Sequence, residues 1–291
     1  MHYHVNGDLI PAEQATVSVA DRGFQYGDAA FETLRAYGGE CFAWDAHRER
    51  LQRTAETLGF GDAVPDDLRA RVAETLDAND LAEAYVKVSV TRGVQPGKLT
   101  PAAEVDPTVV VIVKELPRGG TDGERVWDDF ATVQTVRTRR VPDAALPTDA
   151  KTHNYLNGIL GRLELRRAAT ADHSADECLM RDVEGTVVEG ATSNLFFVSE
   201  NGLRTPAADL DLLPGVTRSV VMDLADAEDF PVETGHYSVD AVREADEAFL
   251  TNSTWEIRPI TSVDGIEIGS GPMTKLLQRL FDERVEELHY G

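Results

Sequence analysis

The sequence predicts an α/β or α+β fold, because strand-like and helix-like segments are mixed in both halves of the chain. A second observation is the stretch at 117–123, where Pro, Gly and polar residues give the composition of a linker. A third is that 42% of the 291 residues are hydrophobic, which is enough to bury one large core or two modest ones. We therefore expect an N-terminal α/β domain at 1–117, a linker at 118–124 and a C-terminal domain at 125–291.

The first half of the chain contains two expected helices and several expected strands. Short strands surround an Asn-Gly turn at Asn6-Gly7, and the first helix is expected to end at Gly59. The helices are expected at 45–59 and 66–79, and later strands at 84–93 and 107–116.

The second half begins with an expected strand at 131–141. Apolar residues at 156, 159, 160 and 163 give residues 154–169 a helical stripe. Hairpin-like strands follow over 177–206, with turns at Glu184-Gly185 and Asn201-Gly202. A further helix is expected to begin at Val216, and the last one runs from about Met273 to the end of the sequence.

The composition excludes several classes of function. There are 51 acidic and 28 basic residues, with a formal net charge of -23, so nucleic acid and anionic lipid are poor partners. Dispersed acidic residues and only five lysines favour a halophilic source, although an ordinary acidic protein is the alternative. No run of about 18 apolar residues predicts a membrane span. Without a signal-like start, and with Cys41 and Cys178 suggesting neither a disulfide framework nor a metal site, we expect a cytoplasmic protein.

Lys151 is the first candidate for chemistry. It lies between an expected strand and an expected helix, and a lysine amine can form a Schiff base with an aldehyde cofactor. A solvated surface charge is the ordinary role of a lysine. Two features favour chemistry: lysine is scarce here, and Lys151 is expected to begin a helix, where the macrodipole disfavours a cation.

Four other segments supply groups that an aldehyde cofactor with a phosphate would need. The segment 213–218 opens a helix, so its first-turn amides and the Thr217 hydroxyl could bind phosphate. Arg50 has the fork of donors that suits phosphate, and 251–254 carries clustered hydroxyls. Glu189, between apolar stretches, could keep a pyridine nitrogen protonated. Taken singly, these could be a simple turn into a helix, a surface ion pair, a polar turn and a hairpin residue.

Taken together, the segments resemble the class IV aminotransferases, the fold-type IV pyridoxal-phosphate enzymes. The resemblance covers nearly the whole chain and keeps the order of the family's motifs. The matching segments are DRGFQYGDAAFETLRAYGG (21–39), HRERL (47–51), TRG (91–93), KTHNYLNGIL (151–160), EGATSNLFF (189–197), LPGVTR (213–218) and TNSTWEIRPI (251–260). The family's fold has a small N-terminal α/β domain and a larger C-terminal domain with a barrel-like sheet, and its members work as homodimers with the cofactor between the domains.

The resemblance also implies residue roles. Lys151 matches the Schiff-base lysine, and Glu189 matches the acid that faces the pyridine nitrogen, supported by Asn194. Tyr155 lies near the position of a tyrosine close to the cofactor ring. The phosphate positions match Arg50, Val216, Thr217, Ser253 and Thr254. Positions of the substrate pocket match Phe31, Glu32 and Arg35.

The expected reaction is transfer of an amino group between an amino acid or amine and a 2-oxo acid. The loop after TRG reads VQPGKLTP, so Lys98 is its one positive residue and the Arg-x-His trap of D-amino-acid enzymes is missing. TNSTWE and KTHNYL depart from standard branched-chain enzymes and look closest to some 4-amino-4-deoxychorismate lyases. Arg137, with Arg139 and Arg140, could hold a substrate carboxylate or face solvent. The lyase is therefore the alternative function, and a pyridoxal-phosphate-binding protein without catalysis is a third.

Overall fold

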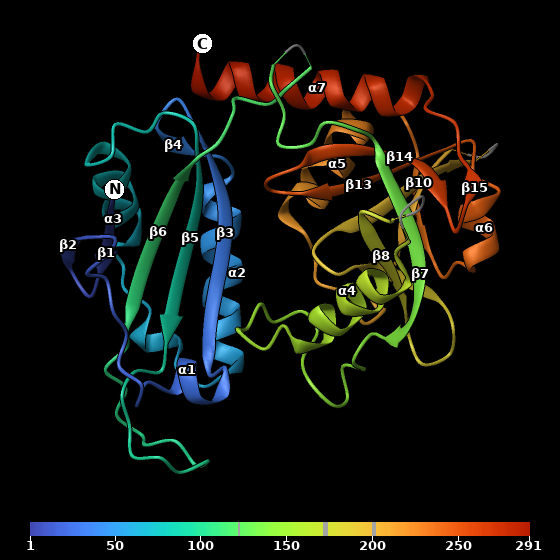
Figure 1. Cartoon of the computed structure of the whole chain (residues 1–291). Coiled ribbons are helices and arrows are strands. Elements are labelled where there is room, and N and C mark those ends of the chain that lie inside the picture. The colour runs from blue at the N-terminus through green and yellow to red at the C-terminus, as the bar shows by residue number, and fades with distance from the viewer. Residues whose placement is uncertain (122, 171–173, 200–201) are drawn as a thin grey trace. The chain divides into compact units, whose positions relative to one another are not determined.

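A computed structural model describes residues 1–121, 123–170, 174–199 and 202–291 (Figure 1). These residues form two compact units. Unit 1 comprises Met1–Arg118, Ala150–Asn154 and His289–Gly291, and unit 2 comprises Gly119–Asp149 and Tyr155–Leu288. The segment around Lys151 therefore belongs to unit 1, although the residues before and after it belong to unit 2.

Unit 1 is built on a six-stranded antiparallel sheet with the strand order β2-β1-β6-β5-β3-β4. Its strands are β1 (His2–Val5), β2 (Asp8–Pro11), β3 (Ala29–Tyr37), β4 (Glu40–Cys41), β5 (Ala84–Thr91) and β6 (Val109–Glu115). Its helices are α1 (Arg22–Tyr26), α2 (Trp44–Thr57), the 3-10 helix η1 (Gly61–Ala63) and α3 (Leu68–Asp77).

Alternation along the strands gives this sheet two different faces. Leu34 and Val86 stand opposite each other on β3 and β5, and they lie in the core together with Leu51 of α2 and Val72 of α3. Side chains at successive strand positions point to opposite faces. Phe31 therefore projects from the face of the sheet that α2 and α3 do not cover.

Unit 2 contains a nine-stranded mixed sheet with the order β12-β11-β10-β13-β14-β7-β8-β9, and β15 pairs with β14. Its strands are β7 (Ala131–Arg139), β8 (Glu177–Arg181), β9 (Val187–Gly190), β10 (Asn194–Ser199), β11 (Gly202–Pro206), β12 (Val232–Gly235), β13 (Glu247–Asn252), β14 (Glu256–Val263) and β15 (Ile266–Glu267). Its helices are α4 (Leu156–Ala168), α5 (Val216–Ala227), α6 (Val239–Arg243) and α7 (Pro272–His289), of which the last residue is counted with unit 1.

The sheet of unit 2 is curled. Strand β9 stands at one end of the strand order, yet the turn at 191–193 leads directly from it into β10, and Gly190 N donates to Ser193 O at 2.7 Å. The curl encloses a core that includes Leu179, Leu195 and Leu250. Polar side chains at the start of β10 and the end of β9 are thereby brought together.

Helix α4 packs closely on the sheet through a glycine. A Cβ built at Gly161 would lie 3.0 Å from Cys178 Sγ, so the helix can approach β8 only with a small residue there. The apolar stripe that predicts this helix is largely not buried in the chain. Leu156, Ile159 and Leu160 are 59%, 52% and 45% exposed.

Apart from the helix start expected at Lys151, the elements expected from the sequence occur in the structure with ends shifted by about two residues at most, a normal uncertainty for helix and strand ends. The end of α2 follows from Gly59, whose φ of 76° and N–H bond to Glu56 O (2.8 Å) stop the helix. The turn at Glu184-Gly185 is also present, whereas Asn201 of the other predicted turn lies outside the described residues. No helix in the described part of the chain is long and apolar enough to cross a membrane.

We expect Leu34→Ala to lower the free energy of unfolding by about 2–5 kcal/mol, because Leu34 is 1% exposed and its truncation leaves a cavity. Leu99→Ala is the matched control, because Leu99 is 81% exposed and should change stability by about 0.5 kcal/mol or less. Urea unfolding followed by circular dichroism measures both. Equal losses in the two variants would contradict the assigned core.

Candidate active site

Lys151 lies in an extended segment that pairs with the edge of β3. Phe31 N donates to Lys151 O at 3.0 Å, and His153 N donates to Ala29 O at 3.0 Å. Lys151 N itself donates to the Thr54 hydroxyl of α2, also at 3.0 Å. The backbone of this lysine is therefore fixed by two elements of unit 1.

The expectation that Lys151 begins a helix is wrong. Helix α4 begins at Leu156, with Tyr155 as its N-cap residue. The reason is that segment 151–153 gives its backbone groups to β3, through a bridge between Ala30 and Thr152. The macrodipole argument therefore does not apply to Lys151. Tyr155 is half-buried and its carbonyl accepts the first bond of α4, from Ile159 N at 3.0 Å.

Two lysines lie against the ring of Phe31. Lys151 Nζ is 4.7 Å and Lys87 Nζ is 4.8 Å from the ring centroid. Burial and then the charge of Lys151 lower the pKa of Lys87. Lys87 was not among the site residues expected from the sequence. The only hint in the sequence is that Lys87 is the one charged residue of the strand AYVKVSVT. In the structure Lys87 pairs with Thr33, which places it on the same face of the sheet as Phe31.

His153 completes this aromatic cluster. Its ring meets Phe31 edge-on with centroids 5.4 Å apart, and its Nε2 lies 3.1 Å from the Ser89 hydroxyl. Burial and then the charge of Lys87 lower the pKa of His153 to about 4. His153 is thus neutral near pH 7, and it adds no third positive charge beside the two lysines.

Arg50 is held by a buried carboxylate. Its Nε and Nη2 donate to the two oxygens of Glu32 at 2.7 Å each, and His47 Nδ1 lies 2.7 Å from Glu32 Oε2. Because a carboxylate only accepts, Nδ1 of His47 carries the hydrogen. Burial raises the pKa of Glu32, but Arg50 and His47 outweigh it and hold that pKa at about 2. Burial also lowers the pKa of His47 against the opposing effect of Glu32.

Two of the predicted substrate residues lie elsewhere in unit 1. Arg35 is 2% exposed, donates to the Pro117 carbonyl, and its guanidinium carbon lies 5.0 Å from the centroid of the Tyr37 ring. Lys98 is exposed in the loop after β5.

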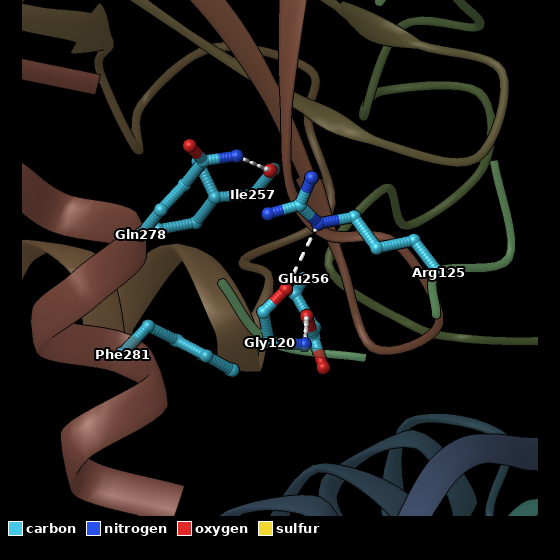
Figure 2. Close-up of a pocket in the computed structure, with 6 residues that line it drawn as sticks. All are labelled: Gly120, Arg125, Glu256, Ile257, Gln278 and Phe281. Carbon is cyan, nitrogen blue, oxygen red and sulfur yellow. Dashed lines mark hydrogen bonds between the residues drawn. The ribbon is translucent and has the colours of Figure 1, made fainter. Parts of the chain in front are cut away.

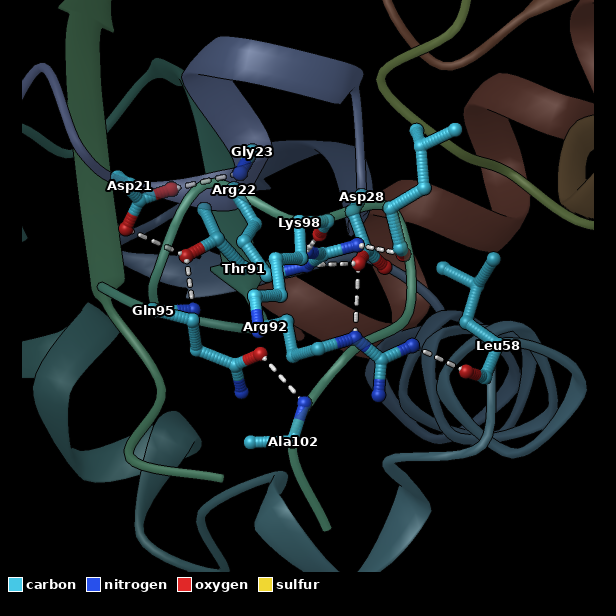
Figure 3. A network of polar contacts seen from close by, with 12 residues as sticks. Asp21, Arg22, Gly23, Asp28, Leu58, Thr91, Arg92, Gln95, Lys98 and Ala102 are labelled. Atoms are coloured by element: carbon cyan, nitrogen blue, oxygen red, sulfur yellow. Dashed lines mark hydrogen bonds and ion pairs between the residues drawn. The ribbon is translucent and has the colours of Figure 1, made fainter. Parts of the chain in front are cut away.

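The loop that carries Lys98 is fastened by buried arginines (Figure 3). Arg22 donates to Lys98 O at 2.6 Å and to Leu99 O at 2.9 Å, while its Nε pairs with Asp28 at 2.7 Å. Arg92 donates to the same oxygen of Asp28 at 2.8 Å and to the Leu58 carbonyl. One carboxylate thus organises two arginines, which join the loop to α1 and to the end of α2.

Glu189, on β9 of unit 2, is a buried carboxylate surrounded by donors. It is 7% exposed, and Arg140 Nε donates to its Oε1 at 2.7 Å. Its Oε2 accepts from Leu213 N at 3.1 Å and from Asn194 Nδ2 at 3.3 Å. These donors compensate the charge of the carboxylate and fix its direction. Of the three arginines in the 137–140 run, Arg140 is therefore the one that reaches a predicted cofactor residue.

Asn194 connects Glu189 to the start of α5. Its Nδ2 also donates to Leu213 O at 3.0 Å, and a Cβ at Gly215 would lie 1.9 Å from its Oδ1. Only glycine can therefore occupy the N-cap position of α5 without displacing Asn194. The glycine of LPGVTR is required by this close approach, which the sequence could not reveal.

The first turn of α5 offers donors. Val216 and Thr217 are its first residues, both buried, and the N-cap Gly215 supplies no side chain to bond their amides. In the described part of the chain, no hydrogen bond of Val216 N, Thr217 N or the Thr217 hydroxyl is found. Unused amides at a helix N-terminus favour an anion.

The predicted hydroxyl cluster lies in the turn between β13 and β14. Asn252 Oδ1 accepts from Thr254 N at 3.0 Å, from the Thr254 hydroxyl at 3.1 Å and from Trp255 N at 2.7 Å. Ser253 is half-buried at the tip of the same turn. The turn is therefore shaped by Asn252, a residue that the sequence analysis named only within its segment.

Arg137 and the pocket shown in Figure 2 both lie in unit 2. Arg137 is exposed, and its backbone N donates to Glu164 Oε1 at 2.7 Å. The pocket in unit 2 is lined by Gly120, Arg125, Glu256, Ile257, Gln278 and Phe281. None of its lining residues is a predicted site residue, and the Glu256 carboxylate in it accepts from Gly120 N at 3.0 Å.

Known proteins that are similar to this chain all belong to one family. Residues 29–263 match the family model described as Amino-transferase class IV. A putative branched-chain-amino-acid aminotransferase of Methanocaldococcus jannaschii is 35% identical over 97% of this chain and 96% of its own length. A D-alanine aminotransferase of Staphylococcus haemolyticus is 31% identical, over 97% of each chain.

Solved structures agree with the fold. A branched-chain aminotransferase from the thermophilic archaeon Thermoproteus uzoniensis, with norvaline, has a TM-score of 0.87 at 27% identity, over 98% of this chain and 94% of that one. A 4-amino-4-deoxychorismate lyase from Pseudomonas aeruginosa has a TM-score of 0.81 at 30% identity, over 99% of both chains. The mixed α/β architecture with a curled sheet is thus that of the fold-type IV enzymes.

The residues present fit pyridoxal phosphate. The unused amides of α5 suit its phosphate, the buried Glu189 suits a protonated ring nitrogen, and Lys151 supplies an amine for its aldehyde. Each of these groups is positioned by backbone or buried hydrogen bonds rather than by exposed side chains.

We expect Glu32→Gln to remove a pH dependence of stability. The folded pKa of Glu32, about 2, is below its ordinary value of 4.5, so its contribution is present above pH 4.5 and is lost as the pH falls towards 2. At pH 7 the variant should be less stable by about 3 kcal/mol, because Arg50 loses its buried partner. Urea unfolding between pH 2 and 7 measures both effects. Glu49→Gln, an exposed position of α2, is the control, and an equal loss there would refute the assignment.

We expect Gly215→Ala to weaken pyridoxal phosphate binding by about tenfold or more, because the added Cβ displaces Asn194 and the start of α5. Gly97→Ala is the control, since a Cβ at Gly97 meets nothing within 4 Å. A spectrophotometric titration of the cofactor-free protein gives both dissociation constants. Unchanged affinity in Gly215→Ala would show that this helix start does not bind the phosphate.

Proposed function

This chain belongs to the class IV aminotransferase family, and from that premise we propose that it moves an amino group between an amino acid and a 2-oxo acid. It is a pyridoxal-phosphate enzyme, as its family is. One observation supports the proposal most: the two residues that match the family's central motifs are both held in place. The backbone of Lys151 is fixed by a hydrogen bond to Thr54, and the buried carboxylate of Glu189 is surrounded by donors.

When bound, pyridoxal phosphate supplies an aldehyde that takes up amines and a ring that accepts the electrons released at the α-carbon. We assign Lys151 as its covalent anchor and as the base that removes and returns the α-proton. Because Lys151 N is bonded to Thr54 and its carbonyl to Phe31, the main chain stays in place while the side chain moves.

Glu189 would hold the proton on the ring nitrogen. Its Oε1 is bound by Arg140, and its Oε2 by Leu213 N and Asn194, so the carboxylate cannot rotate without losing three hydrogen bonds. A carboxylate fixed in this way needs little reorganisation when a cationic nitrogen approaches.

The phosphate would be held by the amides of Val216 and Thr217, with the Thr217 hydroxyl. The matched motif also assigns Arg50 to the phosphate, and both oxygens of Glu32 set the plane of its guanidinium group. Ser253 and Thr254 would add donors from the turn shaped by Asn252, and Tyr155 would lie beside the cofactor ring. These roles follow from the matched motifs and from the local geometry of each group.

Phe31 is the substrate residue that the local geometry favours. Its ring carries the ammonium groups of Lys151 and Lys87 within 5 Å, on the sheet face that α2 and α3 do not cover. Lys98, Arg35 and Arg137 stay predictions from the sequence, and no contact of unit 1 or unit 2 in the described residues adds support for a substrate role. We propose an amino acid with a branched or other apolar side chain as donor, because the M. jannaschii relative is described as a putative branched-chain-amino-acid aminotransferase.

We further propose that the enzyme is a homodimer in a salt-rich cytoplasm. The exposed apolar residues Leu156, Ile159 and Leu160 of α4 form a stripe that a second copy would cover, and Phe24 of α1 is 73% exposed. The net charge of -23 with only 28 basic residues supports the salt-rich setting.

The test follows the visible absorption of the loaded enzyme while L-amino acids, D-amino acids and chiral amines are added one at a time. We expect an L-amino acid with an apolar side chain to change the absorption and to form the matching 2-oxo acid. Lys151→Ala should lose the covalent cofactor, whereas Lys114→Ala, an exposed lysine of β6, should keep it. Retention of the covalent cofactor in Lys151→Ala would overturn the anchor.

The lyase is kept as the second candidate because the P. aeruginosa lyase matches 99% of the chain at 30% identity. Its reaction needs the same Lys151 and Glu189, so the products decide. No response to any amine donor, together with 4-aminobenzoate and pyruvate from 4-amino-4-deoxychorismate, would establish the lyase. No response to either set of substrates would leave a cofactor-binding protein without catalysis.

A further inference from the structure

Two arginines stand directly opposite each other on neighbouring parallel strands of unit 2. The register of β7 and β8 pairs Arg139 with Arg181, and Arg140 N donates to Arg181 O at 2.8 Å just beyond that pair. The strands lie side by side in Figure 1. Like charges at directly paired positions repel, so this arrangement costs stability unless an opposite charge lies between them.

Both guanidinium groups have buried nitrogen atoms without a partner. Among the residues that the structure describes, Arg139 Nη1 and Arg181 Nε are buried and make no hydrogen bond. The side chain of Arg181 makes one bond, from Nη2 to Val136 O at 3.2 Å. A buried donor that is left unsatisfied costs about 1–3 kcal/mol, and more when it is charged.

The carboxylates near this pair are already engaged. Asp264 accepts from Thr135 N at 2.6 Å and its hydroxyl at 2.7 Å, and from Arg243 Nη2 at 2.6 Å. Glu164 accepts from the backbone amides of Arg137 and Thr138 at 2.7 and 3.1 Å. Neither acid forms an ion pair with Arg139 or Arg181 in the described structure.

The electrostatic environment agrees with an excess of positive charge. Burial and then the charge of Arg139 lower the pKa of Arg181, and Arg243 acts in the same direction. Asp264 and Glu164 oppose this effect without reversing it. In a chain with 51 acidic residues, a half-buried arginine pair without a carboxylate is therefore an unusual local arrangement.

The pair is separate from the groups assigned to the cofactor. Arg140, the first residue after β7, directs its side chain to Glu189, whereas the side chains of Arg139 and Arg181 make no hydrogen bond with that carboxylate in the described residues.

We propose that Arg139 and Arg181 form a binding site for a small oxyanion, a phosphate or carboxylate group, held between β7 and β8. Guanidinium groups bind such anions in a bidentate manner, and both unsatisfied nitrogens would gain an acceptor. The bound anion would cancel the repulsion between the strands and so stabilise unit 2. This site does not depend on the proposed reaction.

The experiment is calorimetric titration of the full-length protein, saturated with pyridoxal phosphate so that the cofactor's own phosphate site is filled. Inorganic phosphate and acetate are the two probes, at one low ionic strength kept constant with sodium chloride. We expect saturable binding at one site. The dissociation constants of phosphate and acetate then show which of the two anion types the site prefers. Arg139→Gln and Arg181→Gln should each weaken it by about tenfold or more, and Arg166→Gln, an exposed arginine of α4, should not.

A second readout keeps the test valid if one variant is unstable. The wild-type unfolding temperature should rise with the probe concentration as binding to the folded state requires, and this rise should be absent in the two variants. Absence of saturable binding of either probe up to about 20 mM would overturn the site. So would an equal loss in Arg166→Gln, which would indicate general charge screening.

Discussion

The backbone pairing of segment 151–153 with the edge of β3 is the constraint on which the proposed chemistry depends. Although the residues before and after Lys151 belong to unit 2, this pairing fixes Lys151 in unit 1, where it contacts Phe31 and Thr54. A segment whose main chain is hydrogen-bonded to a sheet moves less than a free loop. The Lys151 amine can therefore move only through rotation of its own side chain. The aromatic ring under it is fixed by the same pairing.

In each unit one buried carboxylate with a proposed role receives several donors. Glu32 binds Arg50 through both oxygens and also faces His47, while Glu189 binds Arg140, Asn194 and a backbone amide. An isolated buried carboxylate would be costly, and these donors offset that cost. The same donors set the directions in which the two acids can act. Arg139 and Arg181 differ, because each has a buried nitrogen without a hydrogen-bond partner in the described residues, and this is the reason for proposing a ligand there.

Much of the fold could be predicted, because the periodic segments are long and the glycine at 59 stops a helix for a local reason. The family motifs also single out Lys151, Glu189 and Arg50 as the proposed cofactor residues. What the sequence could not reveal depends on distant partners. The helix start expected at Lys151 is absent because this segment pairs its backbone with β3. Lys87 lies beside the Phe31 ring because of the register of β5 with β3. Asn194, likewise, explains Gly215 only once both are folded.

Because unit 1 includes late segments of the chain, it cannot be completed until most of the chain has been synthesised. Unit 1 takes in residues 150–154 and 289–291, which leave the ribosome long after residue 118. Until segment 151–153 is made, the first part of β3 has an open edge, and open strand edges pair readily with other chains. A nascent or truncated unit 1 is therefore exposed to aggregation, and chaperone contact during translation would matter most in that interval. Lys151, the proposed cofactor anchor, lies in the segment that closes this edge.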